Sequence, residues 1–150
     1  MKDPNKKKIF IICGILLLIV LSWFYVKHPL VTRIQVGQNI FTIELAITEA
    51  EKEKGLGYRD SLAPNHGMLF PYDHSEKYSF WMKGMRFPID ILWIRDSKII
   101  DISKNVPVAT SSVLPIYSPQ EPANQVLEIN AGASDADGIK IGDLAIILKE

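Results

Sequence analysis

Alternating apolar and polar positions predict short strands along most of the chain. Residues 34–36 and 41–45 alternate with a period of two around a Gly37-Gln38-Asn39 turn, which predicts a hairpin. Residues 89–94 are almost continuously apolar, as in a strand buried on both faces. Further strands are expected at 67–72, 78–83, 99–102, 126–129 and 143–148. Many short strands with little helix predict a mainly β fold, a compact β-sandwich or barrel-like domain.

Helix signals are few and local. Thr48 and Glu51 have the spacing of a capping box, and Gly55 is a suitable helix stop, so one short polar helix is expected between them. A second short helix is expected around residues 134–138, and the proline-rich segment 103–125 is expected to be mostly irregular.

The longest apolar run is near the N-terminus. Residues 9–26 contain no charge, and as a helix they would extend about 27 Å, which predicts a transmembrane anchor. Residues 1–8 are basic, so the positive-inside rule predicts a cytoplasmic N-terminus. Residues 27–32 then form a connector, and residues 33–150 form an extracytoplasmic domain, periplasmic or on the cell surface. The anchor makes the lipid bilayer a predicted partner.

Two other interpretations of the N-terminal run, a cleaved signal peptide and a lipoprotein, fit the sequence less well. Cleavage of a signal peptide needs a small-residue site, and Val20-Leu21-Ser22 is a poor one because aromatic residues 23–25 follow it directly. Cys13 lies too early in the run for lipidation. It is also the chain's one cysteine, so residues 33–150 can form no disulfide and offer no thiol ligand or nucleophile.

Charge excludes one large class of partner. The formal net charge is +0, but residues 1–30 hold five cations and one anion, which leaves 12 cations and 16 anions over residues 31–150, a net charge of −4. Nucleic-acid binding needs clustered lysine and arginine to displace counterions. No nucleic-acid partner is therefore expected.

Five blocks of residues occur in an order that resembles the DUF192 family, also called UPF0127. They are 53–59, 67–70, 80–83, 88–91, and Leu127-Glu128 with Ala131-Gly132. The resemblance covers nearly all of residues 33–149 and implies a compact mainly β sandwich of unassigned function. Gly84-Met85 follows Lys83 where the family usually has Asn-Thr, so any ligand contact made by that polar pair is absent here.

Asp90 interrupts an apolar strand. A buried carboxylate must find partners or take up a proton. In one interpretation Asp90 forms a polar pocket floor and orients Arg59 or Lys83 toward a ligand. In the other, which we favour, it accepts backbone N–H bonds at the turn after Pro88.

Trp81 shares its strand face with Lys83 and not with Phe80. An exposed tryptophan beside a lysine is a platform for a sugar ring, a peptide or an anionic ligand. The alternative is a tryptophan that covers the mouth of the core.

Metal and hydrolytic sites have weak support. Histidines 66 and 74 are separated by an expected strand, and the methionines lie in apolar runs, so no metal and no cofactor is predicted. No serine lies in a nucleophile elbow, and Asp90 with Asp101 is a weak candidate for a carboxylate pair.

The sequence thus predicts a membrane-anchored binding or accessory domain whose ligand residues are Arg59, Trp81, Lys83 and Asp90, with a small molecule, glycan or protein as ligand. One alternative is an envelope enzyme acting on glycan or peptide with Asp90 as acid or base. Another is a purely structural partner of a membrane protein, which would show an exposed apolar patch without a pocket.

Overall fold

The structure is a computed structural model that describes residues 14–17, 32–110 and 114–148. The chain divides into two units, residues 1–31 and 32–150, and each is described by itself. In the first unit residues 14–17 form a short helical stretch with exposed side chains. The predicted basic segment 1–8, most of the predicted anchor 9–26 and nearly all of the predicted connector 27–32 lie outside the described residues. Within the described ranges, no helix has the length and hydropathy needed to cross a membrane.

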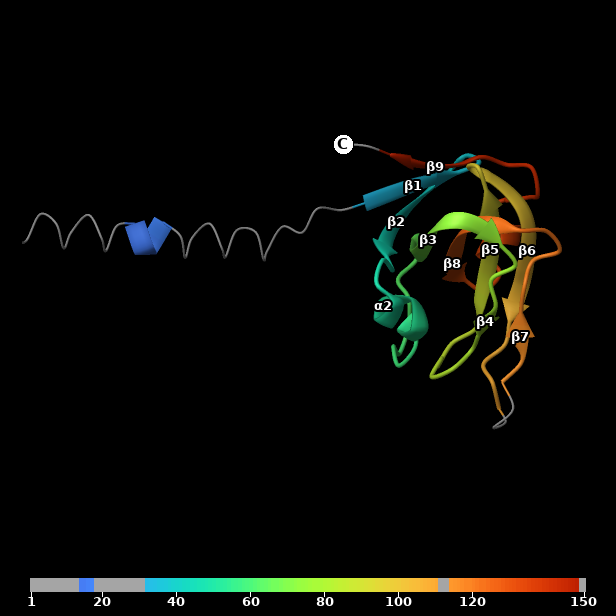
Figure 1. The fold of residues 1–150 in the computed structure, drawn as a ribbon, viewed down its shortest axis with the longest axis horizontal. Coiled ribbons are helices and arrows are strands. Elements are labelled where there is room, and N and C mark those ends of the chain that lie inside the picture. Colours follow the sequence, from blue (N-terminus) through green and yellow to red (C-terminus); the bar gives the residue numbers. More distant parts are fainter. Residues whose placement is uncertain (1–13, 18–31, 111–113, 149–150) are drawn as a thin grey trace, which may run out of the picture. The chain divides into compact units, whose positions relative to one another are not determined.

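The second unit is built from short elements, mostly strands. In chain order they are β1 (Thr32–Val36), β2 (Asn39–Leu45), α2 (Glu49–Lys54), β3 (His66–Glu76), β4 (Phe80–Trp81), β5 (Ile89–Arg95), β6 (Lys98–Val106), β7 (Ile116–Tyr117), β8 (Ala123–Asn130), α3 (Ala133–Ala136) and β9 (Ala145–Leu148). The predicted mainly β class is confirmed (Figure 1).

A seven-stranded sheet has the order β6-β5-β8-β3-β2-β1-β9. Its neighbouring strands are antiparallel except β2 and β3, which pair in parallel. A parallel pair needs a crossover connection, and here the connection contains α2. The sheet topology thus places α2 beside the sheet, where it can form a wall of a site.

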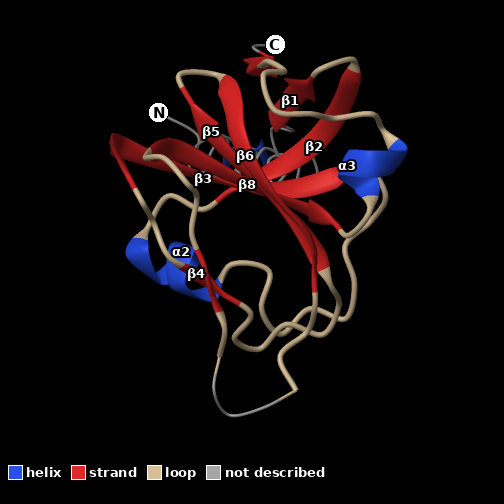
Figure 2. Ribbon diagram, turned by 90° about the vertical axis from the view of Figure 1, so that its right-hand side faces the viewer, coloured by secondary structure: helices blue, strands red, loops and turns tan. Residues whose placement is uncertain are grey.

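The sheet curls so that its two edges approach one another. Lys98 at the start of β6 forms a bridge with Leu144, just before β9. The Ile99 N–H donates to the Asp143 carbonyl at 2.9 Å, and the Ala145 N–H donates to the Ser97 carbonyl at 2.9 Å. The expected sandwich of two facing sheets is therefore replaced by one curled half-barrel sheet, which matches the barrel-like alternative (Figure 2).

Most local predictions are confirmed. The first hairpin forms as β1 and β2, the second as β5 and β6, and α2 has a complete capping box between Thr48 and Glu51. The strand expected at 78–83 is shorter, because only β4 pairs, and its partner β7 lies in the segment expected to be irregular. This separate two-stranded ribbon brings Trp81 beside Ile116.

Each face of the sheet carries its own apolar core. Along β5, Ile91 and Trp93 belong to one core, whereas Leu92 and Ile94 belong to the other. Leu56, just after α2, packs in the first core, and Ala133 of α3 packs against the second. The two short helices accordingly lie on opposite sides of the sheet (Figure 2). Because the central strands are covered on both sides, their polar side chains are buried as well. This applies to Asp90 of β5 and Glu128 of β8, which are described below.

Candidate functional site

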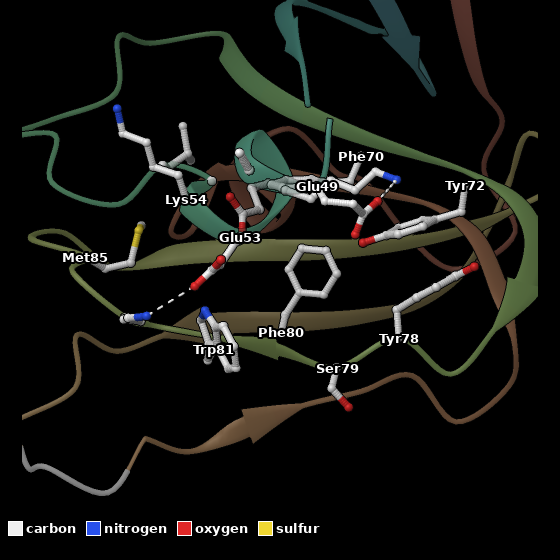
Figure 3. Close-up of a pocket in the computed structure, with 16 residues that line it drawn as sticks. Glu49, Glu53, Lys54, Phe70, Tyr72, Tyr78, Ser79, Phe80, Trp81 and Met85 are labelled. Atoms are coloured by element: carbon white, nitrogen blue, oxygen red, sulfur yellow. Dashed lines mark hydrogen bonds and ion pairs between the residues drawn. The ribbon is translucent and has the colours of Figure 1, made fainter. Parts of the chain in front are cut away.

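A cleft of about 600 Å³ opens between α2 and the ribbon strand β4 (Figure 3). We call it the α2–β4 cleft. It is lined by the α2 face, by aromatic side chains of β3 and β4, and by one carboxyl group of β8: Glu49, Ala50, Lys52, Glu53, Lys54, Gly55, Leu56, Phe70, Tyr72, Tyr78, Ser79, Phe80, Trp81, Lys83, Met85 and Glu128. This volume is within the range of small-molecule sites.

Aromatic rings form the floor and one wall of the cleft. Phe80 packs edge-on against Phe70, with ring centroids 5.0 Å apart, and Tyr72 stacks on Tyr78 at 3.6 Å. In Figure 3 Phe80 lies between this tyrosine pair and Trp81. Trp81 is 46% exposed, so part of its ring is open to solvent at the cleft. The wall therefore offers flat apolar surface that is held in place by ring-to-ring packing.

The rim of the cleft is charged but largely paired. Lys83 forms an ion pair with Glu53 of α2 at 3.4 Å, and Lys52 pairs with Glu49 at 3.2 Å. The Lys83 ammonium also lies 5.6 Å from the centroid of the Trp81 ring. The first of these pairs joins α2 to the chain just after β4, and the dashed line that starts at Glu53 marks it in Figure 3.

Glu128 is the buried carboxyl group of the cleft. It lies on β8 opposite Met68 of β3 and Ile91 of β5, so apolar side chains flank it on both neighbouring strands. The Leu56 backbone N–H hydrogen-bonds the carboxyl group, but Oε2 has no hydrogen-bond partner among the described residues. Desolvation by burial raises the pKa of Glu128 to about 8, although the Leu56 N–H and the Arg59 charge oppose the rise. Buried polar atoms are normally satisfied, so the unpartnered oxygen makes Glu128 the candidate polar contact of the cleft.

Two residues of the cleft lining, Gly55 and Met85, add no polar side-chain atom to it. Gly55 ends α2 with a φ of 50°, and a Cβ atom there would stand 3.6 Å from Glu128 Oε2 and 3.4 Å from the Phe70 ring. Met85, where the sequence departs from the family pattern, is buried and lines the cleft. An apolar side chain thus occupies the second position of the polar pair usual in the family.

Two of the four predicted site residues line the cleft. Trp81 and Lys83 are both exposed. Phe80, just before them, and Met82, between them, are both buried. The predicted alternation of faces is therefore confirmed, and it places the tryptophan and the lysine together at the cleft.

The placement of Asp90 in the site needs correction. Asp90 pairs with Ile129 and Glu128 pairs with Ile91, so the two carboxyl groups point to opposite faces of the sheet. Asp90 is fully buried and accepts hydrogen bonds from the backbone N–H groups of Asn105, Gly132 and Ser134 and from the Ser134 hydroxyl. It accepts backbone N–H bonds as the favoured interpretation requires, but the donors come from β6 and α3 and not from the turn after Pro88.

Arg59 also lies outside the lining of the cleft. Its guanidinium donates to both carboxylate oxygens of Glu44, at 2.5 and 2.8 Å. This pairing raises the pKa of Arg59 and lowers that of Glu44. The predicted contact between Arg59 and Asp90 is wrong, since each has its own partners. Arg59 acts on the cleft through its charge, which favours ionisation of Glu128.

Glu128 was missed as a site residue because strand periodicity assigns it to the polar face. Leu127 and Ile129 flank it, and in a strand covered on one side this alternation would expose the glutamate. A signal was present: Leu127-Glu128 is one of the blocks shared with the family. As for metals, the described residues contain no cluster of three or more histidine, cysteine, aspartate or glutamate side chains able to hold an ion.

Comparisons with known proteins give a family and a fold. The model of the family DUF192, described as "Uncharacterized ACR", matches residues 31–147. A proposed transcription regulator from Sinorhizobium meliloti 1021 is similar at 34% identity and a TM-score of 0.71, over 77% of this chain and 92% of that one. A protein of unknown function from Novosphingobium aromaticivorans is similar at 31% identity and a TM-score of 0.71, over 79% of this chain and 89% of that one. No curated protein matches the chain.

Proposed function

This chain belongs to the DUF192 family, and from that premise we propose that it is a membrane-tethered, extracytoplasmic binding or accessory domain whose ligand occupies the α2–β4 cleft. The observation that carries the proposal is the buried Glu128 carboxyl group, whose Oε2 lacks a partner among the described residues and lines an aromatic-walled cleft. A binding domain can hold such a group ready for a ligand, whereas a purely structural domain gains nothing from leaving it unsatisfied.

Binding fits the cleft better than catalysis does. The alternative of an envelope enzyme relied on Asp90 as acid or base, and Asp90 is enclosed on the other face of the sheet. An acid and base pair in the cleft would need a second carboxylate beside Glu128. The two others that line it, Glu49 and Glu53, are more than half exposed and held in ion pairs with lysines.

The structural relative described as a proposed transcription regulator does not lead us to propose DNA binding here. With 12 cations against 16 anions over residues 31–150, the net charge of the domain is −4. A surface of that sign repels phosphates and has few counterions to release.

We expect the cleft to bind small molecules through Trp81. Ligand-observed NMR of the full chain in lipid nanodiscs, with a panel of amino acids, dipeptides, saccharides and short carboxylic acids, should detect at least one binding class. Trp81→Ala should weaken that binding at least about fivefold, because a stacking ring contributes roughly 1 kcal/mol or more. Folding should be unaffected, since nearly half of the ring is already exposed.

Ile141→Ala is the matched control for this test, because Ile141 is 61% exposed and lies outside the cleft. It should leave binding unchanged. A panel in which no class binds, or binding that is equally strong in Trp81→Ala, would contradict the proposed site.

The tether has its own test. Residues 9–26 carry no charge and follow three consecutive lysines, which supports a signal anchor with a cytoplasmic N-terminus. Protease added to intact spheroplasts should therefore digest residues 33–150 while a cytoplasmic marker protein stays whole. If the domain survives until the spheroplasts are lysed, the proposed topology is wrong.

A further inference from the structure

We infer that the ligand of the α2–β4 cleft is an uncharged sugar ring, which stacks an apolar C–H face on the aromatic wall and exchanges hydrogen bonds with Glu128. This inference rests on the proposed binding function and names the chemical class of the ligand. Three properties of the cleft carry it: the shape of the wall, the pairing of the rim charges, and the state of the buried carboxyl group.

The wall is rigid, flat and only partly covered. The Phe80 ring is held edge-on by Phe70 at 5.0 Å and by Trp93 at 5.4 Å, with interplanar angles of 85° and 89°. Trp81 follows directly and is 46% exposed. Fixed rings lose little conformational entropy when a flat ligand settles on them. A pyranose presents such a flat face in its axial C–H groups.

The rim argues against a cationic ligand. Two rings of the cleft already have ammonium groups of the protein over one face: Lys52 lies 4.5 Å from the centroid of the Tyr72 ring and Lys83 lies 5.6 Å from that of Trp81. The lysine ammonium groups thus occupy the cation–π positions of these rings, and they would repel a cationic ligand.

An anionic ligand is also poorly matched. Lys52 and Lys83 are neutralised by Glu49 and Glu53, and of the cleft's lysines only Lys54 lacks an ion pair among the described side chains. Paired lysines and glutamates instead give a rim of hydrogen-bond donors and acceptors with little net charge. Hydroxyl groups fit such a rim, because each can donate and accept.

The Glu128 carboxyl group has the same dual character. Its burial raises the pKa to about 8, so near pH 7 it is mostly protonated and carries one donor together with acceptor capacity. The Leu56 N–H engages the carboxyl group, whereas Oε2 is buried at the cleft lining and has no hydrogen-bond partner among the described residues. A ligand hydroxyl can accept the proton of the acid or donate to its oxygen, without requiring a buried charge.

The test is the pH dependence of saccharide affinity. Calorimetric titration of the full chain in nanodiscs with maltotriose, cellotriose and N-acetylglucosamine trimer should detect binding. The affinity should be constant between pH 6 and 7 and fall about tenfold between pH 7 and 9, because only the protonated form of Glu128 binds. Moderate salt should have little effect, since no ion pair forms with the ligand.

Two variants separate Glu128 from the other groups that face it. Those groups are Glu49, Lys52, Glu53 and Lys54 of α2, together with Arg59, Tyr72, Tyr78 and Lys83. Glu128→Gln keeps all of them and keeps an uncharged donor and acceptor, so it should bind within about threefold of the parent at pH 7 and lose the pH dependence. Glu128→Ala should lose at least tenfold.

The opposite results overturn the inference. If the three saccharides do not bind, while an amine of the NMR panel binds with an affinity that rises with pH and disappears in Glu128→Gln, the ligand is an ammonium compound. If instead a carboxylic acid of that panel binds with an affinity that falls steeply with salt, the ligand is an anion. In either case the cleft is still a binding site and the proposed function stands. If no compound of any class binds, the proposed function fails as well.

Discussion

Asp90→Ala is expected to destabilise the domain by roughly 3 to 5 kcal/mol, because it removes the acceptor of four hydrogen bonds, two of them buried and two partly buried. The donors left without a partner are three backbone N–H groups and the Ser134 hydroxyl. Two of these N–H groups belong to Asn105 and Gly132, whose φ angles of 51° and 78° are left-handed. The carboxylate thus holds two left-handed backbone positions where β6 meets α3; this conformation is unfavourable for Asn105, whereas Gly132 adopts it readily. Pulse proteolysis across a urea series would measure the loss.

Asp90→Asn should fall between the parent and Asp90→Ala, because its amide retains one acceptor oxygen. Asp60→Ala is the control: Asp60 pairs with Arg86 at an exposed site, so its removal should change stability little. If Asp90→Ala unfolds at the same urea concentration as the parent, the carboxylate does not hold this junction together.

Glu128→Gln is expected to stabilise the domain, by about 4 kcal/mol at pH 8. Burial raises the pKa of Glu128 from its ordinary value of 4.5 to about 8. Between these values the folded state retains a proton that the unfolded state has released, so the stability of the parent falls as pH rises through this window. The glutamine has no proton to release. Parent and variant should therefore be equally stable near pH 4.5 and diverge up to pH 8.

The same urea series, run at pH 4.5, 6 and 8, measures this divergence. Glu121→Gln is the matched control, because Glu121 pairs with Arg95 at an exposed site and should show the same pH profile as the parent. A constant difference between Glu128→Gln and the parent at all three pH values would mean that Glu128 is ionised in the folded domain, and the inferred hydrogen bonding with a sugar would lose its basis.

The elements could be predicted because their signals are local. The capping box at Thr48, the turn at residues 37–39 and the apolar run of β5 each depend on a few neighbouring residues. The arrangement of the strands depends on partners far apart in sequence, such as Lys98 and Leu144, and period-two patterns do not specify which strands pair. For that reason the class was predicted correctly while the sandwich was not.

The site residues also divide into those with a local signal in the sequence and those whose position depends on long-range packing. Trp81 and Lys83 were found because alternation along a single strand separates them from buried Phe80. Glu128 and Asp90 lie on central strands covered on both faces, where alternation no longer distinguishes inside from outside. Which carboxyl group is left with an unpartnered oxygen then depends on the helix above each face. The α3 segment donates three hydrogen bonds to Asp90, whereas the end of α2 leaves Glu128 Oε2 without a partner among the described residues.

The parallel pairing of β2 and β3 has a consequence for how relatives of this domain can diverge. The wall formed by α2 belongs to the crossover that this pairing requires. Ala46 and Leu56, which flank α2, are buried in the core and are therefore constrained by packing. The exposed cleft residues of α2, Glu49, Glu53 and Lys54, lie outside the sheet and can be replaced without breaking its ladder. Substitution on α2 could thus change the entrance while the strands below stay constant, and one scaffold would serve many specificities.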